Sequence, residues 1–226
     1  MPRMRSPAPA DIKPITFYYG SGSPFAWKVW LALEHKRLPY VLRRLSFDAG
    51  DLRTPAYAAI NPRRKVPAIV DDGFALYESG VIVEYLEDKY AGSGEPLWPH
   101  EARTRATARR VTAEVDAYVS PLIVKLTALV FSPPGPDAAA IAEAKQAVAG
   151  ELPLVARSIA GDFIAGASAS AADFTLYPFL ALLGRADDRH PGHRLRTLIP
   201  ERLRAWMTRV EALPYFAATY PPHWRE

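Results

Sequence analysis

The chain contains no cysteine among its 226 residues. This absence excludes disulfide bonds, cysteine nucleophiles and metal sites with cysteine ligands. A chain that needs no disulfide suits a reducing compartment, so the sequence predicts a cytoplasmic protein.

A long hydrophobic run is also absent, since no stretch approaches the 18 uncharged apolar residues of a membrane-spanning helix. The first 13 residues, MPRMRSPAPADIK, hold two arginines but no apolar core of a secretory signal. We therefore expect residues 1–13 to be a flexible tail and the protein to make no membrane contact.

Charge of one sign is in little excess, because 28 basic and 24 acidic residues leave a net charge of +4. The arginines are spread along the chain, which does not call for a nucleic-acid partner. Histidine is scarce as well, and His190 and His193 enclose a Pro-Gly pair typical of a loop. We expect no metal site.

Strand and helix patterns alternate in the first part of the chain. Four short β-branched or aromatic runs predict strands, and two periodic segments with helix-start residues predict helices. In chain order these are residues 15–19 (strand), 24–37 (helix), 40–46, 68–70 and 74–77 (strands), and 78–89 (helix). The Asp71-Asp72-Gly73 stretch between the last two strands is a strong hairpin signal.

Only helical patterns follow residue 100. We expect a long helix over residues 101–131 that is kinked at Pro121, and a second over residues 137–159 that is interrupted near Gly150 and Pro153. Two further helices are expected over residues 170–184 and 200–213. The predicted domains are thus residues 14–92 (α/β), a linker at 93–99, and an all-helical domain at 100–226.

The segment KVPAIVDDGFALYES, from Lys65 to Ser79, interrupts a strand edge. Pro67 has no N–H for a strand ladder. A cis Val66–Pro67 bond would turn the backbone N–H and C=O of Val66 outward, where the backbone of an extended peptide can dock. The alternative is an ordinary edge strand that ends at the proline.

Charged and hydroxyl side chains surround this edge. Ser79 begins a helix, whose free N–H groups favour a carboxylate. Glu78 can accept an ammonium group and Lys65 a second carboxylate. A short peptide with one amino group and two carboxylates fits this set, and glutathione is such a peptide. Each residue also has a plain alternative: Ser79 as a helix cap and Lys65 as a solvated charge.

The segment NPRRKVPAIVDDGFALYESGVIVEYLEDKY resembles the glutathione-binding half of a cytosolic glutathione transferase. The later SASAADFTLYP resembles the capping motif of the helical domain in that family. The resemblance implies an α/β thioredoxin-like N-terminal domain followed by an all-α C-terminal domain, and a homodimer with glutathione as co-substrate. By position, the glutathione-site residues are Lys65, Val66, Glu78 and Ser79, with Pro67 as the cis-proline.

Ser23 is the candidate for activating the glutathione thiol. It precedes Pro24, as a helix N-cap does, and a hydroxyl at a helix start can also donate a hydrogen bond to a thiolate. SPFA resembles the active-site start of serine-type, bacterial-like members. Ser21, Tyr18 and Tyr19 are the alternatives for this role.

The expected reaction is the attack of the bound glutathione thiolate on an apolar electrophile. Aromatic residues that could line a pocket for the electrophile, or else belong to the core, are Phe25, Tyr118, Phe131 and Trp206. A non-catalytic binding or scaffold protein, and a glutathione-dependent peroxidase or dehalogenase, are the alternative functions. Ser170 and Asp173 have the spacing of a capping box, so we expect a structural role for both.

Overall fold

The computed structural model describes residues 12–131 and 137–225, which divide into two compact units. The first unit comprises residues up to 98 together with those from 215 onward, and the second comprises residues 99–214. The expected tail lies almost entirely outside the described residues. The division differs from the expected helical domain of 100–226 because the end of the chain packs on the first unit.

A four-stranded mixed sheet with the order β2-β1-β3-β4 forms the centre of the first unit. Strand β1 (Ile15–Tyr19) pairs in parallel with β2 (Tyr40–Arg44) and antiparallel with β3 (Ala68–Asp71). A hairpin with positive φ at Asp72 and Gly73 joins β3 to β4 (Phe74–Tyr77). The predicted α/β domain, with its parallel start and antiparallel finish, is confirmed.

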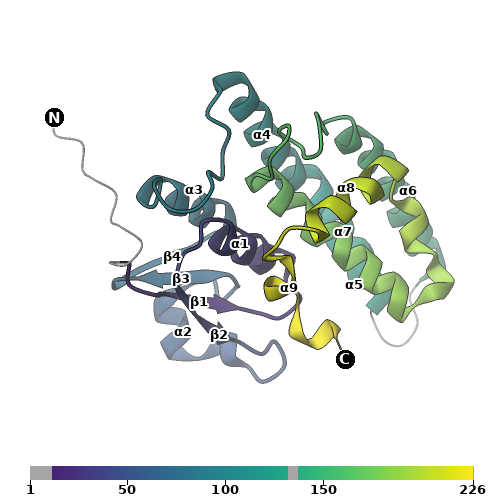
Figure 1. The fold of residues 1–226 in the computed structure, drawn as a ribbon. Coiled ribbons are helices and arrows are strands. Elements are labelled where there is room, and N and C mark those ends of the chain that lie inside the picture. The colour runs from purple at the N-terminus through teal and green to yellow at the C-terminus, as the bar shows by residue number, and fades with distance from the viewer. Residues whose placement is uncertain (1–11, 132–136, 226) are drawn as a thin grey trace. The chain divides into compact units, whose positions relative to one another are not determined.

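Helices cover both faces of this sheet (Figure 1). Helices α1 (Pro24–His35) and α3 (Ser79–Lys89) pack on one face, over the fully buried Phe17. Helix α2 (Pro55–Ile60), which comes after a short 3-10 helix at Asp51–Arg53, lies on the other face. Because side chains alternate along a strand, Tyr18 points to this second face and meets Tyr57 of α2 at a centroid distance of 5.8 Å.

Helix α3 is anchored to the sheet through Asp71. The buried carboxylate of Asp71 accepts hydrogen bonds from Lys89 Nζ at 2.7 Å, from the Tyr85 hydroxyl at 2.7 Å and from the Tyr90 hydroxyl at 2.8 Å. Three donors on one buried acceptor fix the helix against β3. Only Glu78 separates the end of β4 from the start of α3, so the N-terminus of α3 lies beside that strand end.

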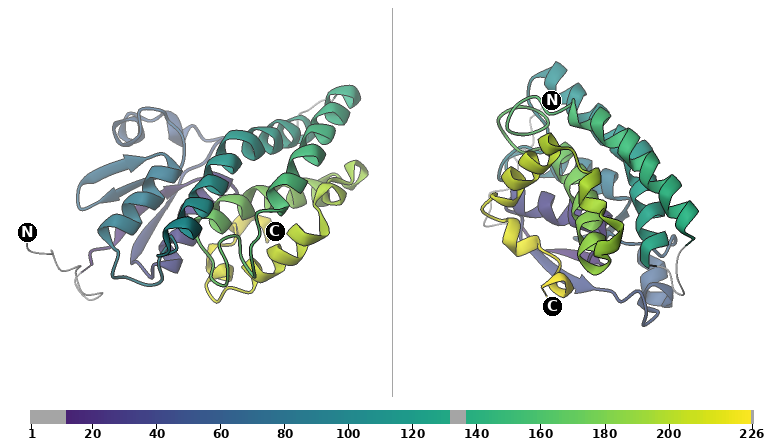
Figure 2. Two further views of the ribbon diagram at one scale, coloured as in Figure 1. Left: turned by 90° about the horizontal axis from the view of Figure 1, so that it is seen from above. Right: turned by 90° about the vertical axis from the view of Figure 1, so that its right-hand side faces the viewer.

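The second unit begins with a helical rod that has no break in its chain (Figure 2). Helix α4 (Ala102–Glu114) passes through a π-helical turn, Val115–Val119, into α5 (Ser120–Phe131). The π turn comes just before Pro121, which has no N–H to offer the preceding turn. The Ser120 hydroxyl donates to the carbonyl of Asp116 at 3.1 Å. The disturbance predicted at Pro121 is therefore a widened helical turn.

Helices α6 (Ala138–Ala156), α7 (Ala171–Arg189) and α8 (Glu201–Glu211) complete this unit, with two short 3-10 helices at Pro191–His193 and Leu195–Leu198. The interruption expected near Pro153 is wrong. Helix α6 continues through it because Leu152 and Val155 are buried on the same stripe as Val148. Within residues 12–131 and 137–225, no helix is both long and apolar enough to cross a bilayer.

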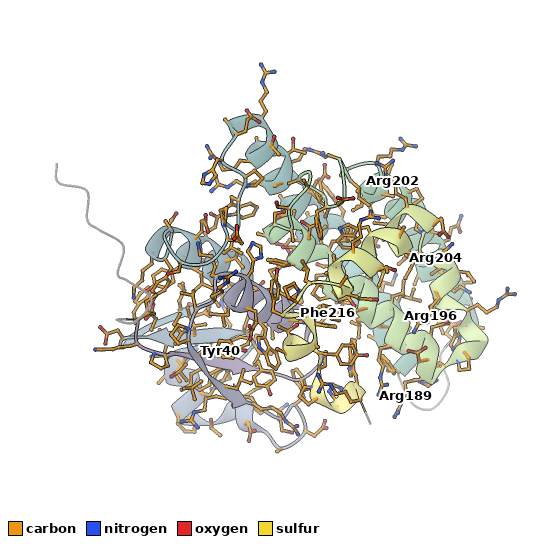
Figure 3. All side chains as sticks on the ribbon, viewed as in Figure 1. Tyr40, Arg189, Arg196, Arg202, Arg204 and Phe216 are labelled. Carbon is orange, nitrogen blue, oxygen red and sulfur yellow. The ribbon has the colours of Figure 1, made fainter. Side chains whose placement is uncertain are left out.

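Arginines project from the surface of the helical unit, among them Arg189, Arg196, Arg202 and Arg204 (Figure 3). Arg196 binds Asp188 at 2.6 Å, and Arg204 forms an ion pair with Glu201. Arg202 donates to the carbonyl of Ile159. The guanidinium groups of Arg196, Arg202 and Arg204 therefore bind acceptors of their own unit.

The end of the chain packs on α1 through a cluster of aromatic rings. Helix α9 (Phe216–Thr219) and the 3-10 helix Pro222–Trp224 surround Trp27. The Trp27 ring lies 5.9, 5.7 and 5.4 Å from the rings of Phe216, Tyr220 and Trp224. Its indole N–H donates to Thr219 Oγ1 at 2.9 Å. Large buried aromatic surface explains why this segment joins the first unit.

Candidate functional site

Ser23 is the N-cap residue of α1. Its extended backbone, with φ −70° and ψ 118°, precedes Pro24 at the first helical position, and its Oγ accepts the N–H of Ala26 at 3.4 Å. Because Oγ is the acceptor in this bond, the hydroxyl hydrogen is available to another acceptor. The cap and a role as a hydrogen-bond donor are therefore compatible at Ser23.

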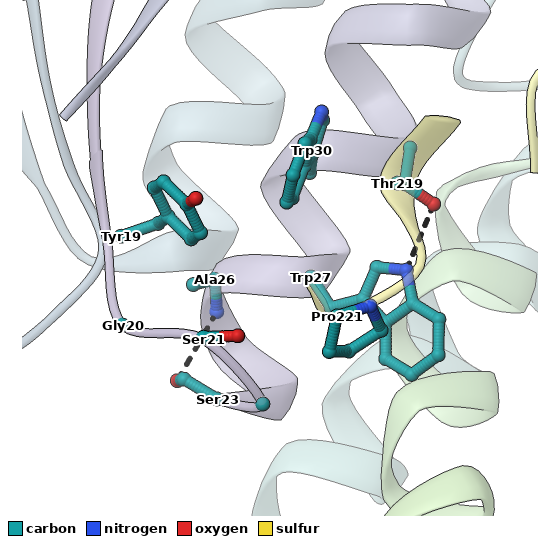
Figure 4. A pocket seen from close by; sticks show the side chains of 10 residues that line it. Tyr19, Gly20, Ser21, Ser23, Ala26, Trp27, Trp30, Thr219 and Pro221 are labelled. Atoms are coloured by element: carbon teal, nitrogen blue, oxygen red, sulfur yellow. Dashed lines mark hydrogen bonds between the residues drawn. The ribbon is translucent and has the colours of Figure 1, made fainter. Parts of the chain in front are cut away.

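A pocket opens at the start of α1 (Figure 4). It is lined by residues 19–23, by Ala26, Trp27 and Trp30 of α1, and by Thr219 and Pro221 from the end of the chain. Ser21 and Ser23 thus lie on the same pocket. The Ser21 hydroxyl makes a hydrogen bond of 2.6 Å with Nδ1 of His223.

The two tyrosines considered for thiol activation lie on opposite faces of β1. Tyr19 lines the pocket, but its ring is buried against Phe17 and Trp30. This burial raises the pKa of Tyr19, which the charge of Arg44 only partly opposes, so the group is a neutral phenol at neutral pH. Tyr18 faces α2 instead.

The Val66–Pro67 peptide bond is cis. Val66 is half-buried, and its backbone N–H and C=O make no hydrogen bond with any of the residues that the structure describes. The carbonyl before it, that of Lys65, accepts from the Tyr57 hydroxyl at 2.6 Å and from Asn61 Nδ2 at 2.7 Å. Two bonds to one carbonyl hold the approach to Val66 in place.

Tyr57 and Asn61 were not expected as site residues. Both side chains are buried, and Asn61 Oδ1 also accepts the N–H of Arg63 at 2.9 Å. The Asn61-Pro62 pair predicts a turn. Its role in orienting the Lys65 carbonyl depends on a fold in which α2 lies beside that loop, which no local pattern reveals.

Glu78 and Ser79 form the start of α3. Glu78 is exposed and has a φ of 71°, which is unusual for a residue with a side chain. Ser79 is the first helical residue and only 8% exposed. The Glu78 side chain does not cap the helix, so it leaves the first N–H groups of α3 without a capping acceptor from that side chain.

Three of the predicted site segments meet at one end of the sheet, where β1 and β4 end and β3 begins. Ala68 pairs with Tyr18 on one side and with Tyr77 on the other. Continuing the β3–β4 register by two residues sets Val66 opposite Ser79, and continuing β1 leads into the loop that ends at Ser23. An unpaired backbone, a helix N-terminus and a capping hydroxyl are therefore neighbours, with the exposed Lys65 and Glu78 at the rim.

The four aromatic residues considered for either a second-substrate pocket or the core differ in their exposure. Trp206 is fully buried and its indole N–H donates to Asp173 at 2.8 Å, so it is a core residue and not part of a pocket. Tyr118 is 59% exposed on the π turn and Phe131 is 43% exposed at the end of α5. Phe25, half-buried at the start of α1, is the member of this set in the first unit.

The Pro-Gly pair predicts a loop at His190 and His193, and the structure has a short 3-10 helix, Pro191–His193, that His190 precedes. Their ring centroids are 6.4 Å apart, and the His190 ring packs at 5.4 Å from Phe131. Among the residues that the structure places, no group of three or more histidine, aspartate or glutamate side chains is arranged to hold a metal ion.

Two sequence families match this chain: "Glutathione S-transferase, N-terminal domain" over residues 22–89 and "Glutathione S-transferase, C-terminal domain" over residues 138–209. Glutathione S-transferase A of Pleuronectes platessa is 28% identical over 225 residues, which cover 95% of this chain and 94% of the relative. Maleylacetoacetate isomerase of Pseudomonas aeruginosa is 40% identical over 113 residues, about half of each protein (46% and 49%). A solved glutathione S-transferase from the Antarctic clam Laternula elliptica superposes with a TM-score of 0.78 at 26% identity, with 95% of both chains covered. With both domain families matched in order and the fold shared over nearly the whole length, the chain belongs to the glutathione S-transferase family.

Proposed function

We propose that the chain conjugates glutathione to an apolar electrophile and that the Ser23 hydroxyl stabilises the reacting thiolate. The observation that carries this proposal is the geometry of Ser23. Its oxygen accepts the Ala26 N–H, which leaves the hydroxyl hydrogen for donation to a ligand at the start of α1.

The strength required of this hydroxyl is modest. A free thiol has a pKa of about 8.5, and lowering it by two units needs about 2.7 kcal/mol of preference for the anion. A hydrogen bond to a charged group contributes about 1.5–3 kcal/mol. The N-terminus of α1 adds about 0.3–1 kcal/mol. Ser23 and the helix together therefore suffice.

The end of the sheet where β3 begins supplies the binding groups for the tripeptide. The free N–H and C=O of Val66, next to the cis Pro67, would pair with the backbone of glutathione as one more strand does. Ser79 and the start of α3 would bind one carboxylate, and the exposed Lys65 a second. The exposed carboxylate of Glu78 would bind the ammonium group.

In the proposed reaction the thiolate sulfur forms a bond to an electrophilic carbon, and the leaving group departs with its electron pair. The thiol proton passes to solvent. Orientation of the two reactants and stabilisation of the anion are the two contributions of the protein. We propose that the protein acts in the cytoplasm, which its lack of cysteine supports. We further propose that it is a homodimer and that it serves detoxification.

The test is retention on a glutathione resin combined with conjugation of an aryl halide followed by absorbance. We expect both. Retention without turnover on a broad panel of electrophiles would overturn the enzymatic part and favour a binding or scaffold protein. Lack of retention would overturn the glutathione site itself.

Product analysis separates the other reactions that a glutathione thiolate supports. Peroxides would give oxidised glutathione, and haloalkanes would release halide. A cis-trans isomerisation is a second candidate, because the isomerase of Pseudomonas aeruginosa is 40% identical over its aligned half. Isomerisation would be favoured over conjugation if the protein turns over a cis-unsaturated diketo acid without consuming glutathione and does not turn over the aryl halide.

A further inference from the structure

One hydrogen bond joins the loop before α1 to the end of the chain. The Ser21 hydroxyl and Nδ1 of His223 are 2.6 Å apart, although 202 residues separate them in sequence. Ser21 lies in the pocket wall two residues before Ser23, and His223 lies in the 3-10 helix Pro222–Trp224. Both belong to the first unit.

The loop and the chain end also pack closely at Gly22. Gly22 has a φ of +78°, which glycine adopts without strain. A Cβ at this position would lie 2.7 Å from Cε1 of His223 and 2.9 Å from Nε1 of Trp224. Only glycine permits this approach, so the imidazole rests directly on the loop backbone.

The segment that carries His223 is itself held by α1. Trp27 donates to Thr219 and packs edge-on against Tyr220 and Trp224. The buried aromatic cluster therefore holds the His223 imidazole beside the loop, and the position of the imidazole does not depend on its bond to Ser21. A fixed group of this kind can restrain the loop that it contacts.

We propose that His223 is a positioning residue for the glutathione reaction: by holding the Ser21 hydroxyl it fixes the loop of residues 20–23 and aims the Ser23 hydroxyl at the thiol sulfur. This inference rests on the proposed function. Gly20 and Gly22 give the loop backbone more conformational freedom than other residues would, which a contact from outside the loop can reduce. Small displacements of a reacting or stabilising group lower a rate by up to about 10²-fold.

The alternative is that His223 only fills space beside Trp224. The two roles differ in what replaces the imidazole. Asparagine at position 223 sets a polar atom near the place of Nδ1 and can still bond to Ser21, whereas leucine keeps the bulk and loses the bond. If the bond is what acts, asparagine restores function and leucine does not.

The experiment compares the full-length protein with its His223→Leu, His223→Asn and Ser21→Ala variants, and with His100→Ala as an exposed control. The measurements are kcat and KM for glutathione with an aryl halide, and the pKa of bound glutathione from the ultraviolet absorbance of its thiolate. We expect His223→Leu and Ser21→Ala each to lower kcat about 10-fold and to raise the pKa of the bound thiol, with KM for glutathione changed less than about 3-fold. The variant that combines His223→Leu with Ser21→Ala should have a kcat no lower than either single variant, because both substitutions remove the same hydrogen bond. His223→Asn should recover most of kcat.

Failure of this inference is distinguishable from failure of the proposed function. A wild-type protein that neither binds glutathione nor conjugates it overturns the function. A wild-type protein that is active, with Ser21→Ala and His223→Leu equally active, overturns the positioning role alone. Additive losses, or a His223→Asn variant as impaired as His223→Leu, also overturn it. Ser21→Ala removes a single oxygen, so it carries the test should His223→Leu fail to fold.

Discussion

The indole N–H of Trp206 donates a hydrogen bond of 2.8 Å to Oδ1 of Asp173, and both side chains are fully buried. Asp173 also accepts the N–H groups of Ile164 at 2.9 Å and Ser170 at 2.8 Å, and the Ser170 hydroxyl at 2.9 Å. One carboxylate thus ties the start of α7 to α8 and to the preceding loop. This network, and not chemistry, accounts for the Ser-x-x-Asp spacing.

Asp173→Ala should destabilise the protein by about 3 kcal/mol or more, because several buried donors lose their acceptor at once. Trp206→Phe removes one donor and should cost less, about 1–2 kcal/mol. The double variant should lose less than the sum of the two. Urea unfolding of the full chain followed by circular dichroism measures all three, and an Asp173→Ala midpoint equal to that of the wild type would contradict the network.

His35 predicts a loss of stability in mild acid. Burial lowers the pKa of His35 below its usual value, although the Pro96 carbonyl and the charges of Glu95 and Glu87 oppose this. Nδ1 makes a hydrogen bond of 2.7 Å with the Tyr215 hydroxyl. The unfolded chain therefore binds a proton that the folded chain does not, and stability falls as pH drops below about 6.5, by at most about 1.4 kcal/mol per pH unit.

Replacing His35 by phenylalanine should remove this dependence while lowering stability at pH 7. The measurement is the free energy of unfolding between pH 7 and pH 5. The exposed control His100→Ala should keep the slope of the wild type. A His35→Phe slope that matches the wild type would show that another group titrates in this range.

Asp71 predicts a second loss at lower pH. Burial opposes ionisation of Asp71, but the hydrogen bonds from Lys89, Tyr85 and Tyr90 outweigh it and hold its pKa below the usual value. Its contribution is therefore present above a pH of about 4 and is lost as the pH falls further. Asp71→Asn should destabilise the protein at pH 7 by about 2 kcal/mol and flatten the acid limb of the curve. Equal acid limbs for variant and wild type would contradict the assignment.

Ser79→Ala should weaken glutathione binding. The hydroxyl at the start of α3 would donate to a carboxylate, and loss of such a bond costs about 1.5–3 kcal/mol, or roughly 10- to 150-fold in Kd. Stability should change little, because Ser79 is the first helical residue and not the cap. Calorimetric titration with glutathione measures the effect, with the exposed Ser168→Ala as the matched control. Unchanged affinity would exclude Ser79 from the site.

Local patterns in the sequence predict the elements that hold most of the site. The Asp-Gly turn predicts the hairpin, the Ser-Pro pair predicts the start of α1 at Ser23, and the proline at position 67 predicts the interrupted edge. These features can be predicted because the backbone preference of a few adjacent residues determines each of them.

The contacts that local patterns miss join distant parts of the chain. Tyr57 reaches the Lys65 carbonyl only after α2 folds under the sheet, and His223 reaches Ser21 only after the chain end returns to α1. Whether Trp206 lines a pocket or belongs to the core depends on α7 packing against it, and it is fully buried. Such contacts depend on tertiary packing, which periodicity does not encode.

The role of the Ser23 hydroxyl is tested most directly by the pKa of bound glutathione. This pKa is measured for the wild type, Ser23→Ala and Ser23→Thr by thiolate absorbance from pH 5 to pH 9. The wild type should hold the thiol about two pKa units below its free value, Ser23→Thr should keep most of that shift, and Ser23→Ala should lose it while still binding glutathione. A Ser23→Ala protein that binds the thiolate with the pKa of the wild type would contradict the role of the Ser23 hydroxyl.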